Sequence, residues 1–196
     1  KYFPLVTIVL VLINVVVFYF EVTRGQAFIE RWAFVPEQFA ADPLGNWYTL
    51  FTALFLHAGL LHIASNMIYL LIFGDNIEHR FGYLPFVVFY FLSGAFGNLA
   101  HMFFSPGSTT PVVGASGAIA GVLGAYILLY PTRPVRVLMF ITVIRLPALI
   151  VIGAWFILQL MSSWALFSGT ADAGGIAYLA HVGGFAAGFL MTFIFK

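Results

Sequence analysis

The stretch GASGAIAGVLGAY, residues 114–126, decides the fold of this chain. It carries no charge but contains four glycines, and a glycine in a helix in water costs about 1 kcal/mol relative to alanine. Small residues recur at every fourth position in two rows, Gly117, Gly121 and Ala125, and Ser116, Ala120 and Gly124. A third row lies near the C-terminus: Ala180, Gly184 and Gly188. Such rows let two membrane helices approach until their backbones touch, so we expect the two segments to pack together.

The composition is that of a membrane protein. Of the 196 residues, 62% are hydrophobic and 8% are charged, which is too little polar surface for a soluble domain of this size. The net charge of +1 indicates no nucleic-acid surface, and the absence of cysteine excludes thiolate catalysis. We expect contact with membrane lipid and no nucleic acid, metal or cofactor. The start at Lys1, without a methionine, indicates a piece of a longer protein.

Six segments are candidates for spanning helices, since about 20 apolar residues cross a hydrocarbon core of about 30 Å. They are residues 3–22, 59–74, 83–104, 115–130, 144–164 and 176–195. Between the first two, charged residues alternate with aromatic ones such as Trp32, Phe34 and Phe39, which predicts short helices in the headgroup region with rings in lipid. The expected fold class is all-α: one polytopic membrane domain over residues 1–196, with a six-helix bundle, an interfacial helical loop over 23–58 and a cap loop over about 165–175.

Lysine and arginine are distributed unevenly over the loops. With the N-terminus inside, the inner side would hold six of them and the outer side two. The inner ones are Lys1, Arg80, Arg133, Arg136, Arg145 and Lys196, and the outer ones are Arg24 and Arg31. By the positive-inside rule, both termini are expected in the cytoplasm.

Polar side chains from three spans are expected at one depth. Ser116 lies fifteen residues before Pro131, and His181 lies fifteen before Lys196, so each is about 22 Å above the inner edge at a rise of 1.5 Å per residue. His62 is about 20 Å above it by the same count. A serine becomes a nucleophile when a base such as neutral imidazole takes its proton. Ser116 and His181 are therefore candidate catalytic residues.

An oxyanion hole is predicted beside them. Ser116 is expected at the start of a helix, where its backbone N–H is free. Asn66 follows His62 by four residues and shares its helix face, so both side chains could add donors. All seven acidic residues lie in loops or at the ends of the expected helices, so we predict a dyad; Asp172, in the loop before the last span, is the one acid that could approach. On spacing alone, however, a buried serine more often bonds to a carbonyl of its own helix.

The remaining polar residues are interpreted as structural. The asparagines and the glutamine within spans are expected to form hydrogen bonds between helices: Asn14, Asn98 and Gln159. His57 and His101 are expected to be structural or interfacial, and His79 to be solvated in a turn over 75–82. Trp155 is interpreted as part of a lipid-facing helix surface.

Three segments together resemble the signature segments of rhomboid intramembrane serine proteases. They are HIASNM at 62–67, GASG at 114–117 and AHVGGFAAG at 180–188. GxSG alone is a weak signal because it is short, but the three segments lie in separate spans and in the order of the family. The resemblance extends from about Trp47 to Phe195.

The resemblance implies a prokaryotic-type enzyme of the inner membrane, with a water-filled cavity open to the outside. It implies Ser116 as nucleophile, His181 as general base, and His62, Asn66 and the Ser116 backbone N–H as the oxyanion hole. Substrates would be single-span membrane proteins, cut in or near a destabilised transmembrane segment through an acyl-enzyme. The oligomeric state stays open.

Other parts of the chain also have counterparts in the family. Helix 144–164 and the loop 168–175 would form a gate and a cap over the active site. Glu78 and Arg80, with Gly82, match a structural turn after the second span.

Two positions depart from the family pattern. Trp47 is followed by Tyr48 where many members have arginine, and Ala120 stands where some members have an aromatic ring against the histidine, so another group must orient His181. The alternatives are a non-catalytic rhomboid-like protein that binds and guides membrane clients, and a small transporter. The retention of Ser116 and His181 disfavours the first, and the lack of an inverted repeat disfavours the second.

Overall fold

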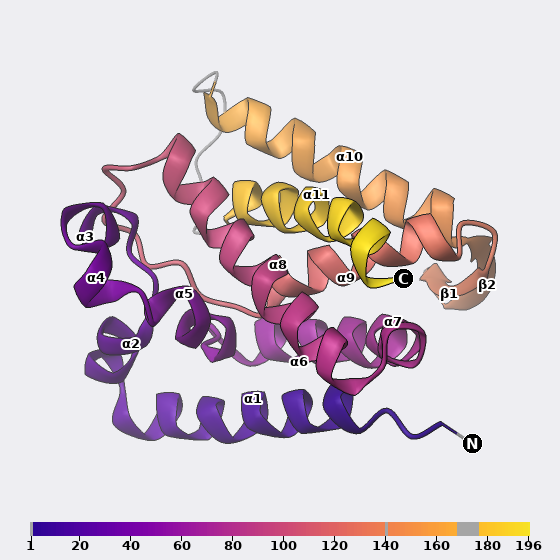
Figure 1. Ribbon diagram of the computed structural model, residues 1–196, viewed down its shortest axis with the longest axis horizontal. Coiled ribbons are helices and arrows are strands. Elements are labelled where there is room, and N and C mark those ends of the chain that lie inside the picture. The colour runs from indigo at the N-terminus through magenta and orange to yellow at the C-terminus, as the bar shows by residue number, and fades with distance from the viewer. Residues whose placement is uncertain (1, 140, 168–176) are drawn as a thin grey trace.

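Long apolar helices make up most of the molecule (Figure 1). The computed structural model describes residues 2–139, 141–167 and 177–196. Within these residues, five helices are long and apolar enough to cross a membrane: α1 (Leu5–Arg24), the continuous helix Leu60–Phe81, α8 (Tyr83–Phe104), α10 (Ala148–Phe167) and α11 (Tyr178–Phe195). The expected polytopic helical membrane fold is confirmed. The expected cap loop lies largely outside the described residues.

The fourth expected span is α9 (Ser116–Leu129), which has only 14 residues. At 1.5 Å per residue this helix is about 21 Å long, shorter than a hydrocarbon core of about 30 Å. All residues from Gly117 to Tyr126 are buried, so α9 is enclosed by the other helices. Irregular backbone can precede such a helix at membrane depth because protein surrounds it.

The expected backbone contact between α9 and α11 is confirmed. A Cβ atom at Gly184 would collide with the carbonyl oxygen of Gly117, and one at Gly188 with that of Gly121, in both cases well within 3.0 Å. Glycine is therefore required for clearance at this interface, which explains the small-residue rows. Because α11 also packs against α8, the first turns of α9 and α11 are held side by side in the interior.

The second span is a single helix in three parts: α6 (Leu60–Tyr69), a π-helical turn η2 (Leu70–Gly74) and α7 (Asp75–Phe81). The expected end at residue 74 and the turn over 75–82 are wrong. Nothing in the sequence breaks the helix before Gly82, whose φ of +85° ends it. His79 is exposed as expected, but it lies on α7.

Glu78 on α7 is buried and caps the start of α1. Its carboxylate accepts hydrogen bonds from the Thr7 N–H (2.7 Å), the Thr7 hydroxyl (2.6 Å), the Val6 N–H (3.0 Å) and the Tyr2 hydroxyl (3.2 Å). The first N–H groups of a helix have no partner within it, and the positive end of its dipole favours a negative charge. Glu78 therefore ties the start of α1 to the end of the second span.

A β hairpin precedes α10 and was not expected. β1 (Pro134–Met139) pairs in antiparallel register with β2 (Thr142–Pro147). The helix expected over 144–164 therefore begins only at Ala148. β-branched residues over 142–144 favour a strand, and the residue before Pro147 is disfavoured in a helix. The hairpin lies at the same end of the molecule as both chain termini (Figure 1).

Short helices connect α1 to the second span, as expected. They are α2 (Gln26–Trp32), α3 (Pro36–Ala41), α4 (Pro43–Asn46), α5 (Thr49–Thr52) and the 3-10 turn η1 (Ala53–Phe55). α2, α3 and α4 lie at the end of the molecule opposite the two termini (Figure 1). The expectation that Phe34 lies in lipid is wrong, because its ring is fully buried against Ala53 and Val112.

Candidate active site

Ser116 is the first residue of α9, and the segment before it is anchored by backbone hydrogen bonds. Val112 and Phe34 exchange two of them, at 2.7 and 3.2 Å, and the Gly114 N–H donates to the Ala53 carbonyl at 3.0 Å. These bonds satisfy buried backbone groups that would otherwise be costly at this depth. Gly114 has a φ of +128°, a conformation that favours glycine. The start of α9, and with it Ser116, is therefore fixed by the interfacial segment.

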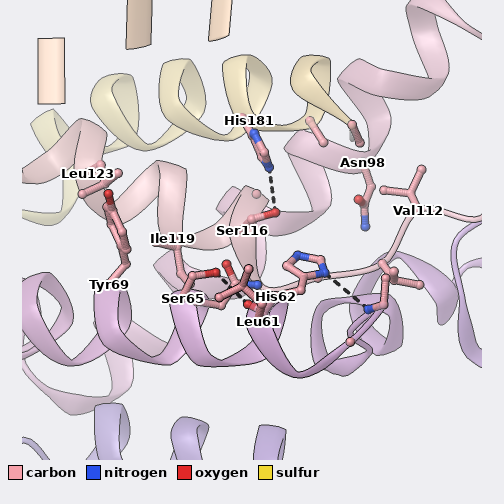
Figure 2. Close-up of a pocket in the computed structure, with 18 of the residues that line it drawn as sticks. Leu61, His62, Ser65, Tyr69, Asn98, Val112, Ser116, Ile119, Leu123 and His181 are labelled. Atoms are coloured by element: carbon pink, nitrogen blue, oxygen red, sulfur yellow. Dashed lines mark hydrogen bonds between the residues drawn. The ribbon is translucent and has the colours of Figure 1, made fainter. Parts of the chain in front are cut away.

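His181 lies in the first turn of α11 and faces Ser116 (Figure 2). The distance from His181 Nε2 to Ser116 Oγ is 2.8 Å, and both residues are half-buried. The expected contact between hydroxyl and imidazole is present. A bond from Ser116 to its own helix is disfavoured because Ser116 begins α9 and the Val112 carbonyl, four residues earlier, accepts from Phe34.

The other ring nitrogen of His181 contacts α10. His181 Nδ1 lies 2.8 Å from Gln159 Oε1, which confirms the expected interhelical hydrogen bond of Gln159. Trp155 lies one turn earlier on α10, and its ring centroid is 6.0 Å from that of His181. The interpretation of Trp155 as lipid-facing is therefore wrong. The signal was available, since a polar residue inside an apolar helix marks its inward face and Trp155 shares that face at a spacing of four.

His62 approaches Ser116 from α6, on the side opposite His181 (Figure 2). The Ala58 N–H donates to His62 Nδ1 at 3.3 Å, so Nδ1 is an acceptor and the proton of the neutral ring is on Nε2. A Cβ atom at Gly114 would lie 2.9 Å from His62 Nε2 and 3.4 Å from Ser116 Oγ. The donor nitrogen of His62 therefore lies near the hydroxyl of Ser116.

Asn66 lies one turn after His62, and its side chain is buried. Its amide nitrogen has no hydrogen-bond partner within the described ranges, which is uncommon for a buried donor. Asn66 and His62 line the same cavity as Ser116. A donor without a partner beside a serine hydroxyl is available to a bound oxygen atom.

These groups line one cavity of about 750 Å³. Its walls come from α6, α8, α9, α10, α11 and the segment before α9, and its size is typical of sites that enclose a ligand, about 300–1,000 Å³. Apolar side chains such as Leu61, Ile119 and Leu123 complete the lining (Figure 2). Among the described residues, no group of three or more His, Asp or Glu side chains is placed to hold a metal ion.

The other polar residues singled out from the sequence lie apart from Ser116, His181, His62 and Asn66 or at the edge of their cavity. Asn98 lines the cavity and donates from Nδ2 to the Leu50 carbonyl on α5 at 3.1 Å, as expected for an interhelical bond. Asn14 instead bonds to Leu10 in its own helix, so that expectation is wrong. Asp172 lies outside the described residues.

His57 precedes α6 and contacts His62, with ring centroids 5.0 Å apart. Burial lowers the pKa of His57 to about 4, with a smaller contribution from the neighbouring His62. His57 is therefore uncharged at neutral pH. Its backbone N–H donates to the Glu21 carboxylate at 2.9 Å, which links the end of α1 to the loop before α6.

The chain is similar to known proteins over most of its length. The sequence model of the Rhomboid domain matches residues 44–196. Rhomboid protease GluP of Bacillus subtilis (strain 168) is 31% identical over 188 residues, which cover 95% of this chain and 34% of that protein. RHOMBOID-like protein 1 of Arabidopsis thaliana is 33% identical over 155 residues, or 76% of this chain and 34% of that protein. RHOMBOID-like protein 6, mitochondrial, of the same plant is 29% identical over 154 residues, or 75% and 43%. The chain thus spans less than half the length of these relatives.

Proposed function

The chain belongs to the rhomboid family, and from this premise we propose that it is an intramembrane serine endopeptidase with a Ser116–His181 dyad. The proposal depends on one observation above all, the distance of 2.8 Å between Ser116 Oγ and His181 Nε2. Both atoms belong to half-buried residues at the wall of a cavity large enough to enclose a peptide segment.

The reaction would proceed by acyl transfer. His181 Nε2 takes the proton of Ser116 while Oγ attacks the carbonyl carbon of the scissile bond, which gives a tetrahedral intermediate. His181 then returns that proton to the leaving amine, and the acyl-enzyme remains on Ser116. Water attacks the ester with His181 again as base, which releases the second product and restores the serine hydroxyl.

The negative charge on the attacked oxygen would be stabilised by three donors. The N–H of Ser116 is at the first position of α9, where no intrahelical acceptor exists. The His62 Nε2–H and the amide of Asn66 add side-chain donors from α6. Donors that are already in place before the charge develops are typically the largest contribution to acyl-transfer catalysis.

The substrates would be single-span membrane proteins. An intact transmembrane helix hides its carbonyl groups in its own hydrogen bonds, so a segment weakened by glycine or proline would enter the cavity more easily. We place both termini in the cytoplasm of a prokaryotic cell and the cavity on the outer side, with α9 as a sixth crossing. The uneven distribution of Lys and Arg supports this orientation, and so does the position of both termini at one end of the molecule.

The decisive experiment is labelling with a fluorophosphonate probe in detergent. Wild type should be modified at Ser116, and Ser116→Ala should lose both labelling and cleavage of a membrane substrate without a lower unfolding temperature. His181→Ala should label at least about 10³-fold more slowly, because a dyad acts as a unit. Ser65→Ala is the matched control, since Ser65 lines the same cavity but donates to the backbone of His62.

Full cleavage activity of Ser116→Ala would refute the assignment. An unlabelled, folded wild type would favour the alternative, a rhomboid-like protein that binds and guides membrane clients without cutting them.

A further inference from the structure

The side chain of Gln159 contacts the ring nitrogen of His181 that faces away from Ser116. The Gln159 side-chain oxygen lies 2.8 Å from His181 Nδ1, and an amide oxygen can only accept a hydrogen bond. The proton of the neutral ring must therefore be on Nδ1. Nε2 then has a free lone pair, 2.8 Å from the Ser116 hydroxyl. This is the tautomer in which His181 can act as a base.

We propose that Gln159 is a positioning residue, which holds His181 in its base-competent tautomer and orientation. The inference rests on the proposed function and assigns α10 a part in it. Within the described part of the chain, the imidazole forms hydrogen bonds only with Ser116 and Gln159. Ala120 has no aromatic ring that could pack against the imidazole. The hydrogen bond to Gln159 therefore fixes the rotation of the imidazole about its Cβ–Cγ bond.

Aromatic contacts keep α10 close enough for this bond. Phe156 stacks on Phe185 of α11, with ring centroids 4.1 Å apart and an interplanar angle of 21°. The ring of Trp155 lies beside the imidazole, with ring centroids 6.0 Å apart and an interplanar angle of 37°. Because both contacts join α10 to α11 within about one turn of Gln159, they limit how far Gln159 can move from the ring.

The effect of Gln159 should be on the chemical step and not on substrate binding. Gln159 is not among the residues that line the cavity, so its removal should leave KM unchanged. A neutral amide orients the imidazole but adds no charge to stabilise the imidazolium, so its contribution should be smaller than that of a catalytic aspartate. We expect a loss of about 10- to 100-fold, the range of a buried hydrogen-bond partner left unsatisfied.

The kinetic test compares two variants of Gln159 with one matched control. Gln159→Leu keeps the side-chain volume but has no acceptor, and should lower kcat and the fluorophosphonate labelling rate about 10- to 100-fold with KM unchanged. Gln159→Glu retains an acceptor for Nδ1–H and should recover most of the lost rate. Ser163→Ala is the matched control on α10, one turn after Gln159. It removes a hydroxyl that donates to the backbone carbonyl of Gln159 at 2.8 Å, and it should behave as wild type.

A spectroscopic test on the wild-type protein does not depend on whether a variant of Gln159 folds. The ¹⁵N signals of the His181 ring, assigned by their loss in His181→Ala, distinguish a protonated from an unprotonated nitrogen. We expect Nδ1 protonated and Nε2 unprotonated in the wild-type protein at neutral pH. In Gln159→Leu the ring should populate both tautomers.

Failure of this inference can be distinguished from failure of the proposed function. An unlabelled wild type contradicts the function itself. A wild type that labels at Ser116, together with a Gln159→Leu variant of unchanged kcat, overturns the role of Gln159 alone. A wild-type ring protonated on Nε2 would overturn it as well.

Discussion

The substitution Gly184→Ala tests whether the contact between α9 and α11 positions the proposed dyad of Ser116 and His181. The added Cβ would lie within 3.0 Å of the carbonyl oxygen of Gly117, and this neighbour is backbone, which cannot rotate away. To restore an ordinary contact, α9 and α11 would have to separate by roughly 1 Å at this level. Gly184 lies three residues after His181 on the same helix face. The separation would therefore lengthen the bond of 2.8 Å between His181 and Ser116 beyond hydrogen-bond range.

The expected magnitude follows from that displacement. A misplacement of about 1 Å in a catalytic constellation costs on the order of 10²-fold in rate, so labelling of Ser116 should fall by about that factor. Overpacking costs about 1–3 kcal/mol of unfolding free energy, of which alanine returns about 1 kcal/mol through its higher helix propensity. The protein should therefore stay folded while it loses most of its activity.

The assay is the rate of fluorophosphonate labelling and of substrate cleavage in detergent, beside the thermal unfolding midpoint. Gly153→Ala on α10 is the matched control, because a Cβ there would have no atom within 4 Å, and it should retain wild-type labelling. A Gly184→Ala variant that labels Ser116 at the wild-type rate would refute the view that close backbone contact sets the dyad distance.

Three further substitutions test other parts of the structure. Gly114→Ala would place a Cβ 2.9 Å from the His62 ring at a φ of +128°, and should lower kcat by about 10²-fold; unchanged kinetics would contradict the placement of His62 beside this loop. Asn66→Ala should reduce kcat by at most about 10²- to 10³-fold with KM unchanged, and a variant with normal kcat would remove Asn66 from the oxyanion hole. Glu78→Gln should lower the free energy of unfolding by about 1–3 kcal/mol, because its hydrogen bonds to α1 become weaker. The unfolding midpoint should fall while the kcat of the folded fraction stays normal. A loss of kcat without a loss of stability would contradict a purely structural role.

Some of the site could be predicted from local spacing. Rows of small residues at intervals of four predict helices in backbone contact, and the glycine surroundings on α9 and α11 agree. Counting the helical rise from the ends of the spans also predicted that Ser116, His181 and His62 lie at one level, and all three line one cavity. These predictions succeed because helical rise and small-residue packing depend on local sequence alone.

Other features could not be read from spacing. Glu78 was expected in a turn, and its burial against the start of α1 depends on where two helices distant in sequence meet. The hairpin before α10 depends on pairing between two strands, for which a short apolar segment gives no distinct signal. Gln159 was expected to bond between helices, but its partner was not identified.

By itself, the sequence determined that this chain is a helical membrane protein, which segments are apolar and which polar residues lie deep among them. Only the tertiary structure decided which side chain meets which: the imidazole of His181 between Ser116 and Gln159, and the carboxylate of Glu78 on the first turn of α1. The physical reason is that apolarity and helical rise are properties of consecutive residues, whereas a hydrogen bond between helices depends on their relative rotation and separation, which the packing of the whole bundle sets.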